Sequence, residues 1–251
     1  MARKIVITSG KGGVGKTILA VKLSVALAKK GQRVILFDGD FGLNNADLAL
    51  GVENFVTYDI VDVIEGRCRA KQALIRHPKY PNLSVLTSGR VAPERYISPQ
   101  AVKVVLDALS PQFDFIFIDC PAGVEEGFHR AVATADEGIV VTTLETASLR
   151  DADKVISVLN GYRLGGVYLT INKVRGDRLA SGEGLTPTEV AQLLRLPLLG
   201  VLPEEEELTE NHLSVRLLAA NLLKGEQKLY DPTKKYSGFF GNIRRALKKR
   251  L

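Results

Sequence analysis

The chain has 251 residues, of which 45% are hydrophobic and 25% charged, a balance typical of a folded α/β domain and not of a disordered chain. Its two cysteines, Cys68 and Cys120, are too few for a disulfide framework or a four-cysteine zinc site. Residues 234–251 contribute +7 to the net charge of +6, so the remaining chain carries −1, which argues against a basic nucleic-acid-binding body.

Neither a signal peptide nor a membrane span is visible in the sequence. The first four residues lead directly into the apolar run that starts at Ile5, without the apolar core of a secretory signal. No apolar run approaches the roughly 20 residues that a helix needs to cross a bilayer. We therefore expect a soluble, cytoplasmic body.

Short runs of apolar and β-branched residues alternate with helical patterns along the chain. Several of these runs are apolar throughout, as at Phe115–Ile118, which is typical of a parallel sheet covered on both faces. We therefore predict an α/β fold: a doubly wound, mostly parallel sheet with helices on both faces. The predicted strands are 4–8, 33–38, 83–87, 113–119, 138–143, 167–172 and 198–202, and the predicted helices lie near 16–30, 57–64, 99–110, 126–135, 147–160, 186–195 and 207–222.

The segment GKGGVGKT, residues 10–17, lies between the first predicted strand and the first helix. It matches the G-x-x-x-x-G-K-[ST] pattern of a phosphate-binding loop, so residues 1–223 are predicted to form a P-loop domain. In such a loop, backbone N–H groups face phosphate oxygens, Lys16 bridges the β- and γ-phosphates, and the hydroxyl of Thr17 ligates Mg²⁺. The predicted nucleotide-binding residues here are Gly10, Lys11, Gly12, Gly13, Val14, Gly15, Lys16, Thr17 and Ile18.

Lys11 distinguishes this loop, because most phosphate-binding loops accept any residue directly after the first glycine. With Lys11, the loop resembles the deviant Walker loop of the ParA/MinD family of ATPases. The resemblance implies that Lys11 reaches across a dimer interface to the phosphates of the partner's ATP and, with Lys16, stabilises the charge that develops during phosphoryl transfer. It therefore implies ATP and Mg²⁺ as cofactors, and a homodimer that forms with ATP.

The resemblance continues at the ends of the second and fourth predicted strands. It implies that Asp40 positions the attacking water, that Asp38 lies near the magnesium, and that Asn45 belongs to the nucleotide-linked interface. Asp119 resembles the aspartate that holds magnesium through water, and Gly123 resembles a glycine that contacts the γ-phosphate. Aspartate and asparagine are also common in plain turns. Two carboxylates beside a phosphate loop repel each other without a cation, however, which favours the magnesium site.

Three further positions bear on the nucleotide. Asn172 corresponds to a family residue that reads the adenine edge, and Pro203 lies where the family's backbone packs along the base. Each of the two is equally consistent with an ordinary strand exit. Ile18 departs from the family pattern, which often has a threonine that reaches the α-phosphate. Losing this hydrogen bond removes about 1 kcal/mol, or about 1.5–3 kcal/mol when the partner is charged.

The end of the chain predicts an amphipathic membrane-targeting helix, residues 239–251, after a polar linker, residues 224–238. One such helix binds an anionic membrane surface weakly, whereas two on one dimer bind far better. We therefore expect reversible, peripheral attachment to the inner face of the cell membrane. A helix docked on its own domain is the alternative, and a grip on nucleic acid would leave the apolar stripe unexplained. The apolar stripe includes Phe239, Phe240, Ile243 and Leu247, and its basic flank includes Arg244 and Lys248.

These features favour the MinD branch of the family, whose members place the division septum by recruiting a division inhibitor to the membrane. Slow ATP hydrolysis, stimulated by a partner protein, then releases the dimer. One alternative is an FlhG-type ATPase, which regulates flagellar number, but its usual N-terminal extension is not expected because the first strand begins at residue 4. The other is a ParA-type DNA-segregation ATPase, which needs a basic body. No nucleic-acid partner is expected.

Overall fold

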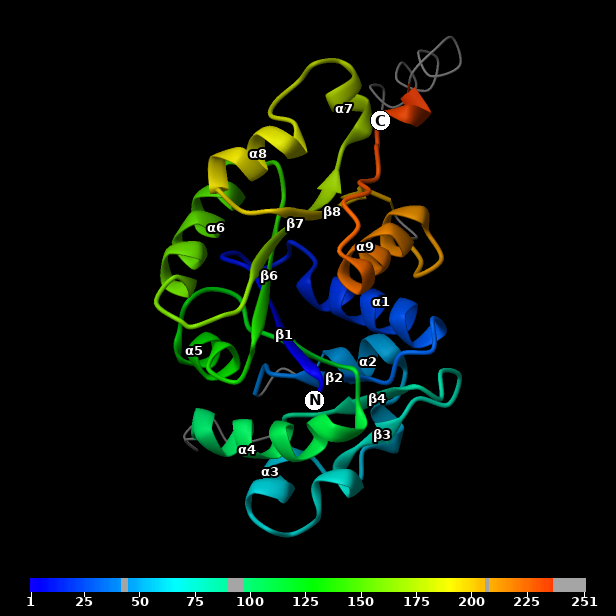
Figure 1. Ribbon diagram of the computed structural model, residues 1–251, viewed down its shortest axis with the longest axis vertical. Coiled ribbons are helices and arrows are strands. Elements are labelled where there is room, and N and C mark those ends of the chain that lie inside the picture. The colour runs from blue at the N-terminus through cyan, green and yellow to red at the C-terminus, as the bar shows by residue number, and fades with distance from the viewer. Residues whose placement is uncertain (42–44, 90–96, 206–207, 237–251) are drawn as a thin grey trace.

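A single eight-stranded sheet runs through the protein in the computed structural model, which describes residues 1–41, 45–89, 97–205 and 208–236 (Figure 1). The strand order is β3-β4-β2-β5-β1-β6-β7-β8, and all neighbours are parallel except β3 and β4. The predicted doubly wound α/β fold is therefore confirmed. The strands are β1 Arg3–Thr8, β2 Val34–Asp38, β3 Ile75–Arg76, β4 Leu83–Leu86, β5 Phe115–Asp119, β6 Glu137–Thr142, β7 Val167–Val174 and β8 Leu198–Pro203.

The described part of the chain has nine α-helices, four of them only five to seven residues long; eight lie between strands, and α9 follows the last strand. The two longest, α1 and α6, follow β1 and β6 directly. The helices are α1 Lys16–Lys29, α2 Ala46–Leu50, α3 Ile60–Ile64, α4 Pro99–Leu109, α5 Glu126–Val132, α6 Thr146–Leu159, α7 Gly176–Ala180, α8 Pro187–Leu194 and α9 Leu213–Lys224, with a short 3₁₀ turn η4 at Lys234–Tyr236.

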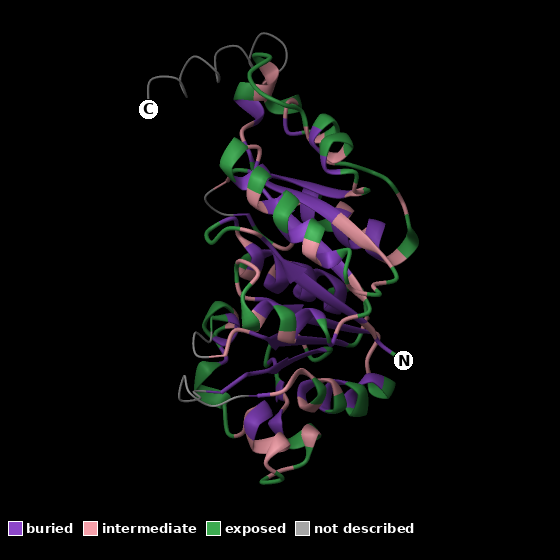
Figure 2. Cartoon of the chain, turned by 90° about the vertical axis from the view of Figure 1, so that its left-hand side faces the viewer, coloured by how far each residue is buried: buried purple, intermediate pink, exposed green. Residues whose placement is uncertain are grey.

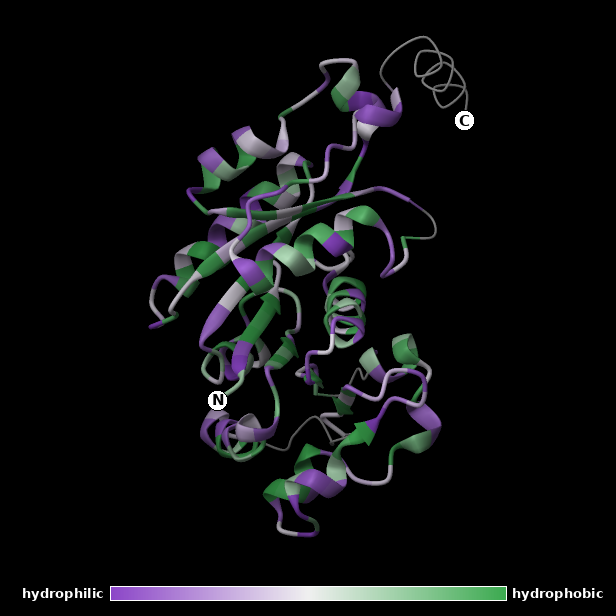
Figure 3. Cartoon of the chain, turned by 45° about the vertical axis from the view of Figure 1, so that its right-hand side comes forward, coloured by the Kyte–Doolittle hydropathy of each residue, from purple (hydrophilic) through white to green (hydrophobic). Residues whose placement is uncertain are grey.

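The core lies on both faces of the sheet, because successive strand residues point to opposite sides. Ile5 and Ile7 of β1 belong to one hydrophobic cluster, which includes the buried sides of α1 and α9. Val6 belongs to the cluster on the opposite face, which includes the buried sides of α3, α4, α5, α6 and α8. Figure 2 shows the sheet almost wholly buried between exposed helix surfaces, and Figure 3 shows the matching hydrophobic strands. This arrangement explains the apolar runs of the central strands.

The differences from the predicted elements lie in short or late segments. All seven predicted strands are present, but β3 and the helices α2 and α7 were not predicted. The helix predicted from residue 207 begins only at Leu213, where the His212 side chain accepts the N–H of Ser214. The helix predicted from residue 57 begins at Ile60, because the Asp59 carboxylate caps the N–H groups of Val61 and Asp62.

The described part of the predicted linker packs against the body of the protein. We call residues 225–236 the strap: they run from the end of α9 along β8 to α7 (Figure 1). The Asn221 side chain of α9 bonds both the carbonyl and the N–H of Lys228, at 2.9 and 3.2 Å. Residues 237–251 lie outside the described part of the chain, and with them the predicted membrane residues Phe239, Phe240, Ile243, Arg244, Leu247 and Lys248.

Among the described residues, no helix has both the length and the apolarity to cross a bilayer.

Candidate functional site

The candidate site lies where β1, β2 and β5 end together at one edge of the sheet. Strand register pairs Asp119 with Ile7 on one side and with Asp38 on the other, so both carboxylates emerge next to the loop that follows β1. Parallel strands bring these positions together although they are far apart in sequence. Ligands of open α/β sheets bind at such carboxyl ends.

The phosphate-binding loop depends on two glycines with left-handed backbone angles, Gly13 with φ of 78° and Gly15 with φ of 96°. Gly15 also lacks room for a side chain, because a Cβ there would lie 2.4 Å from Nδ2 of Asn172. At the other end of the loop, a Cβ on Gly10 would lie 2.1 Å from the carbonyl oxygen of Asp151 in α6. Close packing therefore requires glycine at both ends of the loop.

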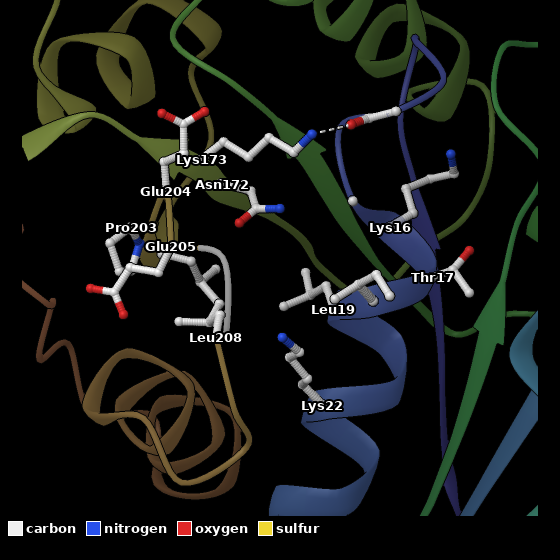
Figure 4. Close-up of a pocket in the computed structure, with 14 residues that line it drawn as sticks. Lys16, Thr17, Leu19, Lys22, Asn172, Lys173, Pro203, Glu204, Glu205 and Leu208 are labelled. Carbon is white, nitrogen blue, oxygen red and sulfur yellow. Dashed lines mark hydrogen bonds between the residues drawn. The ribbon is translucent and has the colours of Figure 1, made fainter. Parts of the chain in front are cut away.

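Two neighbouring side chains of β7 hold the loop in place. Asn172 donates from Nδ2 to the carbonyl of Val14 at 2.8 Å. Lys173 donates from Nζ to the carbonyl of Gly13 at 2.7 Å (Figure 4). Lys173 itself has a left-handed φ of 56°, at an irregularity in the β7–β8 pairing. The two bonds fix two consecutive carbonyl groups of the loop. Sequence analysis placed Asn172 at the base and missed Lys173.

Asp119 is a buried acid of the site, and one of its carboxylate oxygens has no hydrogen-bond partner among the described residues. Its residue is 3% exposed, and this oxygen is Oδ1. Burial, together with nearby Asp38 and Asp40, raises the pKa of Asp119 to about 7, against the opposing effects of Thr17 and Lys16. A buried carboxylate oxygen beside a threonine hydroxyl at a phosphate loop suits a divalent cation with oxygen ligands.

Protein side chains alone do not complete a metal site here. In the described ranges, no group of three or more His, Cys, Asp or Glu side chains is placed to hold an ion. A cation at Thr17 and Asp119 would therefore take its remaining ligands from phosphate and water, as Mg²⁺ commonly does in nucleotide sites.

Asp38, predicted to lie near the magnesium, organises the following loop. Its carboxylate accepts the backbone N–H groups of Asp40 at 3.1 Å, Asn45 at 2.9 Å and Ala46 at 3.0 Å. Burial raises the pKa of Asp38, and these three hydrogen bonds oppose the rise. Asp38 thus supports the start of α2, where Asn45 is exposed at the helix N-terminus. Its proximity to a metal stays a prediction.

Lys16 and Asp40 approach each other beside Asp119. Burial lowers the pKa of Lys16, whereas Asp119, Cys120 and Asp40 raise it. Burial likewise raises the pKa of Asp40, and Lys16 opposes this. Cys120, the residue after Asp119, is also buried, with 2% of its surface exposed. The site therefore gathers one buried cation and several acids at one point, where added phosphate and metal charges would balance each other.

Lys11 lies at the surface, away from its own cavity. Its side chain is 48% exposed, and its Nζ lies 3.9 Å from Oε2 of the exposed Glu145. Lys11 is not among the described residues that line the cavity beside the phosphate loop. Gly123, with φ of 87°, donates its N–H to the carbonyl of Ser9 at 3.0 Å. A contact between Gly123 and a phosphate would require this bond to break.

The cavity beside the loop has a volume of about 540 Å³, within the range of small-molecule and cofactor sites. Figure 4 shows Lys16 and Lys22 reaching from α1, and Asn172 and Pro203 facing them from β7 and β8. Both predicted adenine-side residues, Asn172 and Pro203, thus line the same cavity as the phosphate loop. Ile18 also lines it, with 48% of its surface exposed.

Comparisons with known proteins agree with this arrangement. A family model described as an AAA domain matches residues 2–164. The septum site-determining protein MinD of Synechocystis is 38% identical over 248 residues, covering 98% of this chain and 90% of the relative. The chain belongs to the MinD family.

Solved structures of MinD proteins superpose closely on this chain. MinD in the MinC:MinD cell division protein complex of Aquifex aeolicus has a TM-score of 0.81 and 34% identity, with coverage of 90% of this chain and 96% of that one. MinD of Pyrococcus horikoshii complexed with Mg-ADP has a TM-score of 0.77 and 30% identity, with coverage of 89% and 97%. These findings favour neither the FlhG-type nor the ParA-type alternative.

Proposed function

We propose that the protein is a MinD ATPase that acts in division-site placement, as an ATP-dependent dimer that docks on the membrane. One observation carries this proposal: a phosphate loop with a buried, half-satisfied Asp119 beside Thr17, and a Lys11 that lies outside its own cavity. The Mg-ADP bound to MinD of Pyrococcus horikoshii supports the same ligands for this chain.

The residues of the chain take distinct parts in the proposed reaction. The loop N–H groups and Lys16 bind the phosphates, Thr17 and Asp119 hold Mg²⁺, and Asp40 orients the attacking water. Bound Mg²⁺ neutralises phosphate charge and so lowers the barrier to transfer. Asp38 fixes the backbone of Asp40 through a 3.1 Å hydrogen bond and so positions this acid relative to the loop.

Lys11 accounts for the dimer. A lysine that reaches its own cavity would serve a monomer, but Lys11 points to the surface, where its Nζ lies 3.9 Å from Oε2 of Glu145. Across a two-fold interface, the same lysine would meet the phosphates of the second subunit. We therefore propose that ATP, sandwiched between two subunits, completes the interface, with Asn45 and Gly123 responding to the γ-phosphate.

The proposed partners are a division inhibitor, an ATPase activator and the membrane. The complex of MinD with MinC in Aquifex aeolicus supports the inhibitor. Membrane attachment rests on residues 239–251, with residues 1–223 as the ATPase domain. The protein would then be cytoplasmic and reversibly peripheral on the inner membrane face.

Sedimentation velocity with ATP, ADP and no nucleotide tests the dimer. We expect a dimer with ATP and Mg²⁺ and a monomer in the other two conditions. Equal association with ADP, or none with ATP, would refute the proposal.

A further inference from the structure

Glu205 lines the nucleotide cavity and also contacts the strap. It lines the nucleotide cavity together with Pro203 and Leu208, yet its carboxylate is turned away from Lys16 and Thr17 (Figure 4). One carboxylate oxygen, Oε1, bonds Nζ of Lys235 in the strap, and the other, Oε2, lies 3.4 Å from Nε2 of His212. Both oxygens are thus engaged on the side away from the cavity.

His212 supports this orientation of Glu205. Its Nδ1 accepts the backbone N–H of Ser214 at 3.2 Å, so in the neutral ring the proton resides on Nε2, the nitrogen that faces Glu205. Burial lowers the pKa of His212, which favours this neutral form. The His212 ring also meets the ring of Tyr230 in the strap edge-on, with centroids 5.2 Å apart.

The strap is held on the body at several points besides Glu205. Asn221 bonds the backbone of Lys228, and a Cβ on Gly176 of α7 would lie only 2.1 Å from the carbonyl oxygen of Pro232. The strap is therefore closely packed against α9 and α7. Its last described turn, η4, carries Lys235.

We propose that Glu205 is a positioning residue of the nucleotide site, and that the strap keeps it in place through Lys235. This inference deepens the proposed function, since it rests on the cavity taking a nucleotide. Without Lys235, a partly buried carboxylate would turn toward a cavity whose ligand carries negative phosphates, and their repulsion would weaken binding. Coupling is reciprocal, so a bound nucleotide would also stabilise the docked strap.

This contact links the nucleotide cavity directly to the segment that precedes residues 237–251. A conformational change at the cavity wall would therefore alter the position of the strap through this contact, without a rearrangement of the sheet. The link concerns the described residues Glu205, His212 and Lys235 alone.

Binding of ADP with Mg²⁺, measured by titration calorimetry, tests the proposal, because ADP is expected to bind without dimerisation. We expect Lys235→Met to weaken ADP affinity about two- to fivefold, the range of a partly exposed ion pair. In a Glu205→Gln background, the same substitution should have no further effect, because a neutral side chain is not repelled by phosphate. Lys228→Met is the matched control. It removes a strap lysine whose Nζ pairs with Oε2 of the neighbouring Glu226 at 3.0 Å, and it should leave affinity unchanged.

Hydrogen exchange of residues 228–236 gives a second, independent measurement. ADP should slow exchange there in the wild type and not in Lys235→Met. Unchanged affinity in Lys235→Met, or an equal loss in the Glu205→Gln background, would overturn the positioning role. Failure of the wild-type chain to bind ADP would instead refute the proposed function, and this inference with it.

Discussion

Gly15 shows how strongly a single position can control the phosphate loop. An alanine there would be strained by the φ of 96° and would press its Cβ against Asn172. A left-handed backbone costs an L-residue roughly 1–2 kcal/mol. We therefore expect Gly15→Ala to lower the free energy of unfolding by at least this amount and to abolish stabilisation by ADP, measured as a thermal shift.

Gly31→Ala provides the matched control for this strain. Gly31 has a similar φ of 84°, but an added Cβ would meet nothing within 4 Å. Gly31→Ala should lower the free energy of unfolding by a similar amount and keep its thermal shift with ADP. Loss of the shift in both variants would mean that general destabilisation, and not the contact with Asn172, is responsible.

Lys11 should matter for association and not for binding within one chain. Because its side chain lies outside its own cavity, Lys11→Ala should bind ADP as the wild type does but fail to dimerise with ATP, as measured by sedimentation velocity. Lys71→Ala removes an exposed lysine of another surface and serves as the control. Normal ATP-dependent dimerisation of Lys11→Ala would rule out the bridging role.

Asp119 should determine how strongly Mg²⁺ increases the affinity for ADP. Replacing its carboxylate removes the predicted partner of metal-bound water, so Asp119→Asn should reduce the Mg²⁺-dependent gain in ADP affinity about 10- to 100-fold. Affinity measured in EDTA should change little, because the loop and Lys16 are intact. Asp114→Asn, at the opposite end of β5, is the control. An unchanged magnesium effect in Asp119→Asn would contradict the assigned metal site.

For single residues, a site residue can be predicted from the sequence when it belongs to a short local pattern. A role that depends on a contact between residues distant in the sequence leaves no such pattern. The loop, Thr17 and Asp119 could be found because the glycine pattern and the strand exit are short-range signals. The bonds from Asn172 and Lys173 to the loop join residues about 160 positions apart, and a lysine at a strand exit looks like any exposed lysine. The three hydrogen bonds of Asp38 were likewise invisible, since they require the loop to fold back.

At the scale of elements, α4 is joined to the start of the sheet by Lys4. Nζ of this buried lysine bonds Asp107 of α4 and lies 3.6 Å from Asp136. Burial opposes ionisation of Asp107, but bonds from Lys4 and Lys103 hold its pKa below the usual range. Asp107 therefore contributes stability that is present above its unfolded-state pKa and is lost as pH falls through its lower folded-state pKa.

Asp107→Asn should therefore lower the free energy of unfolding by about 1 kcal/mol at pH 7 and by less near pH 3. Lys103→Gln, which removes only the more exposed partner of Asp107, should cost less at pH 7. Urea unfolding at the two pH values measures both effects. An equal loss at pH 7 and pH 3 would show that the ion pair is not the cause.

The prediction of helices and strands was most accurate for elements whose residues are almost all buried. Apolar runs such as Phe115–Ile118 are typical of strands in a covered sheet, and this run forms most of β5. The short helix α2 depends on the Asp38 carboxylate, which bonds the N–H groups of Asn45 and Ala46 at its start. The strap has a polar composition typical of a linker, yet Asn221 and Gly176 hold it in place. Such elements arise from tertiary contacts that no local pattern contains.

At the scale of the whole molecule, the site, the surface lysine and the C-terminal segment form one system. The sheet edge gathers the phosphate loop, Asp38 and Asp119, and Lys11 extends outward from the same edge. The strap connects the wall of the cavity to the chain that leads into residues 237–251. We therefore expect nucleotide binding, dimerisation and membrane attachment to be coupled, so that a change in one alters the other two.

Co-sedimentation with anionic phospholipid vesicles tests this central claim most directly. The full chain should sediment with vesicles in ATP and Mg²⁺ and remain in the supernatant in ADP. A chain that lacks residues 239–251 should stay in the supernatant with either nucleotide while still forming the ATP-dependent dimer. Equal sedimentation of the full chain in ADP, or sedimentation that survives removal of residues 239–251, would contradict the account.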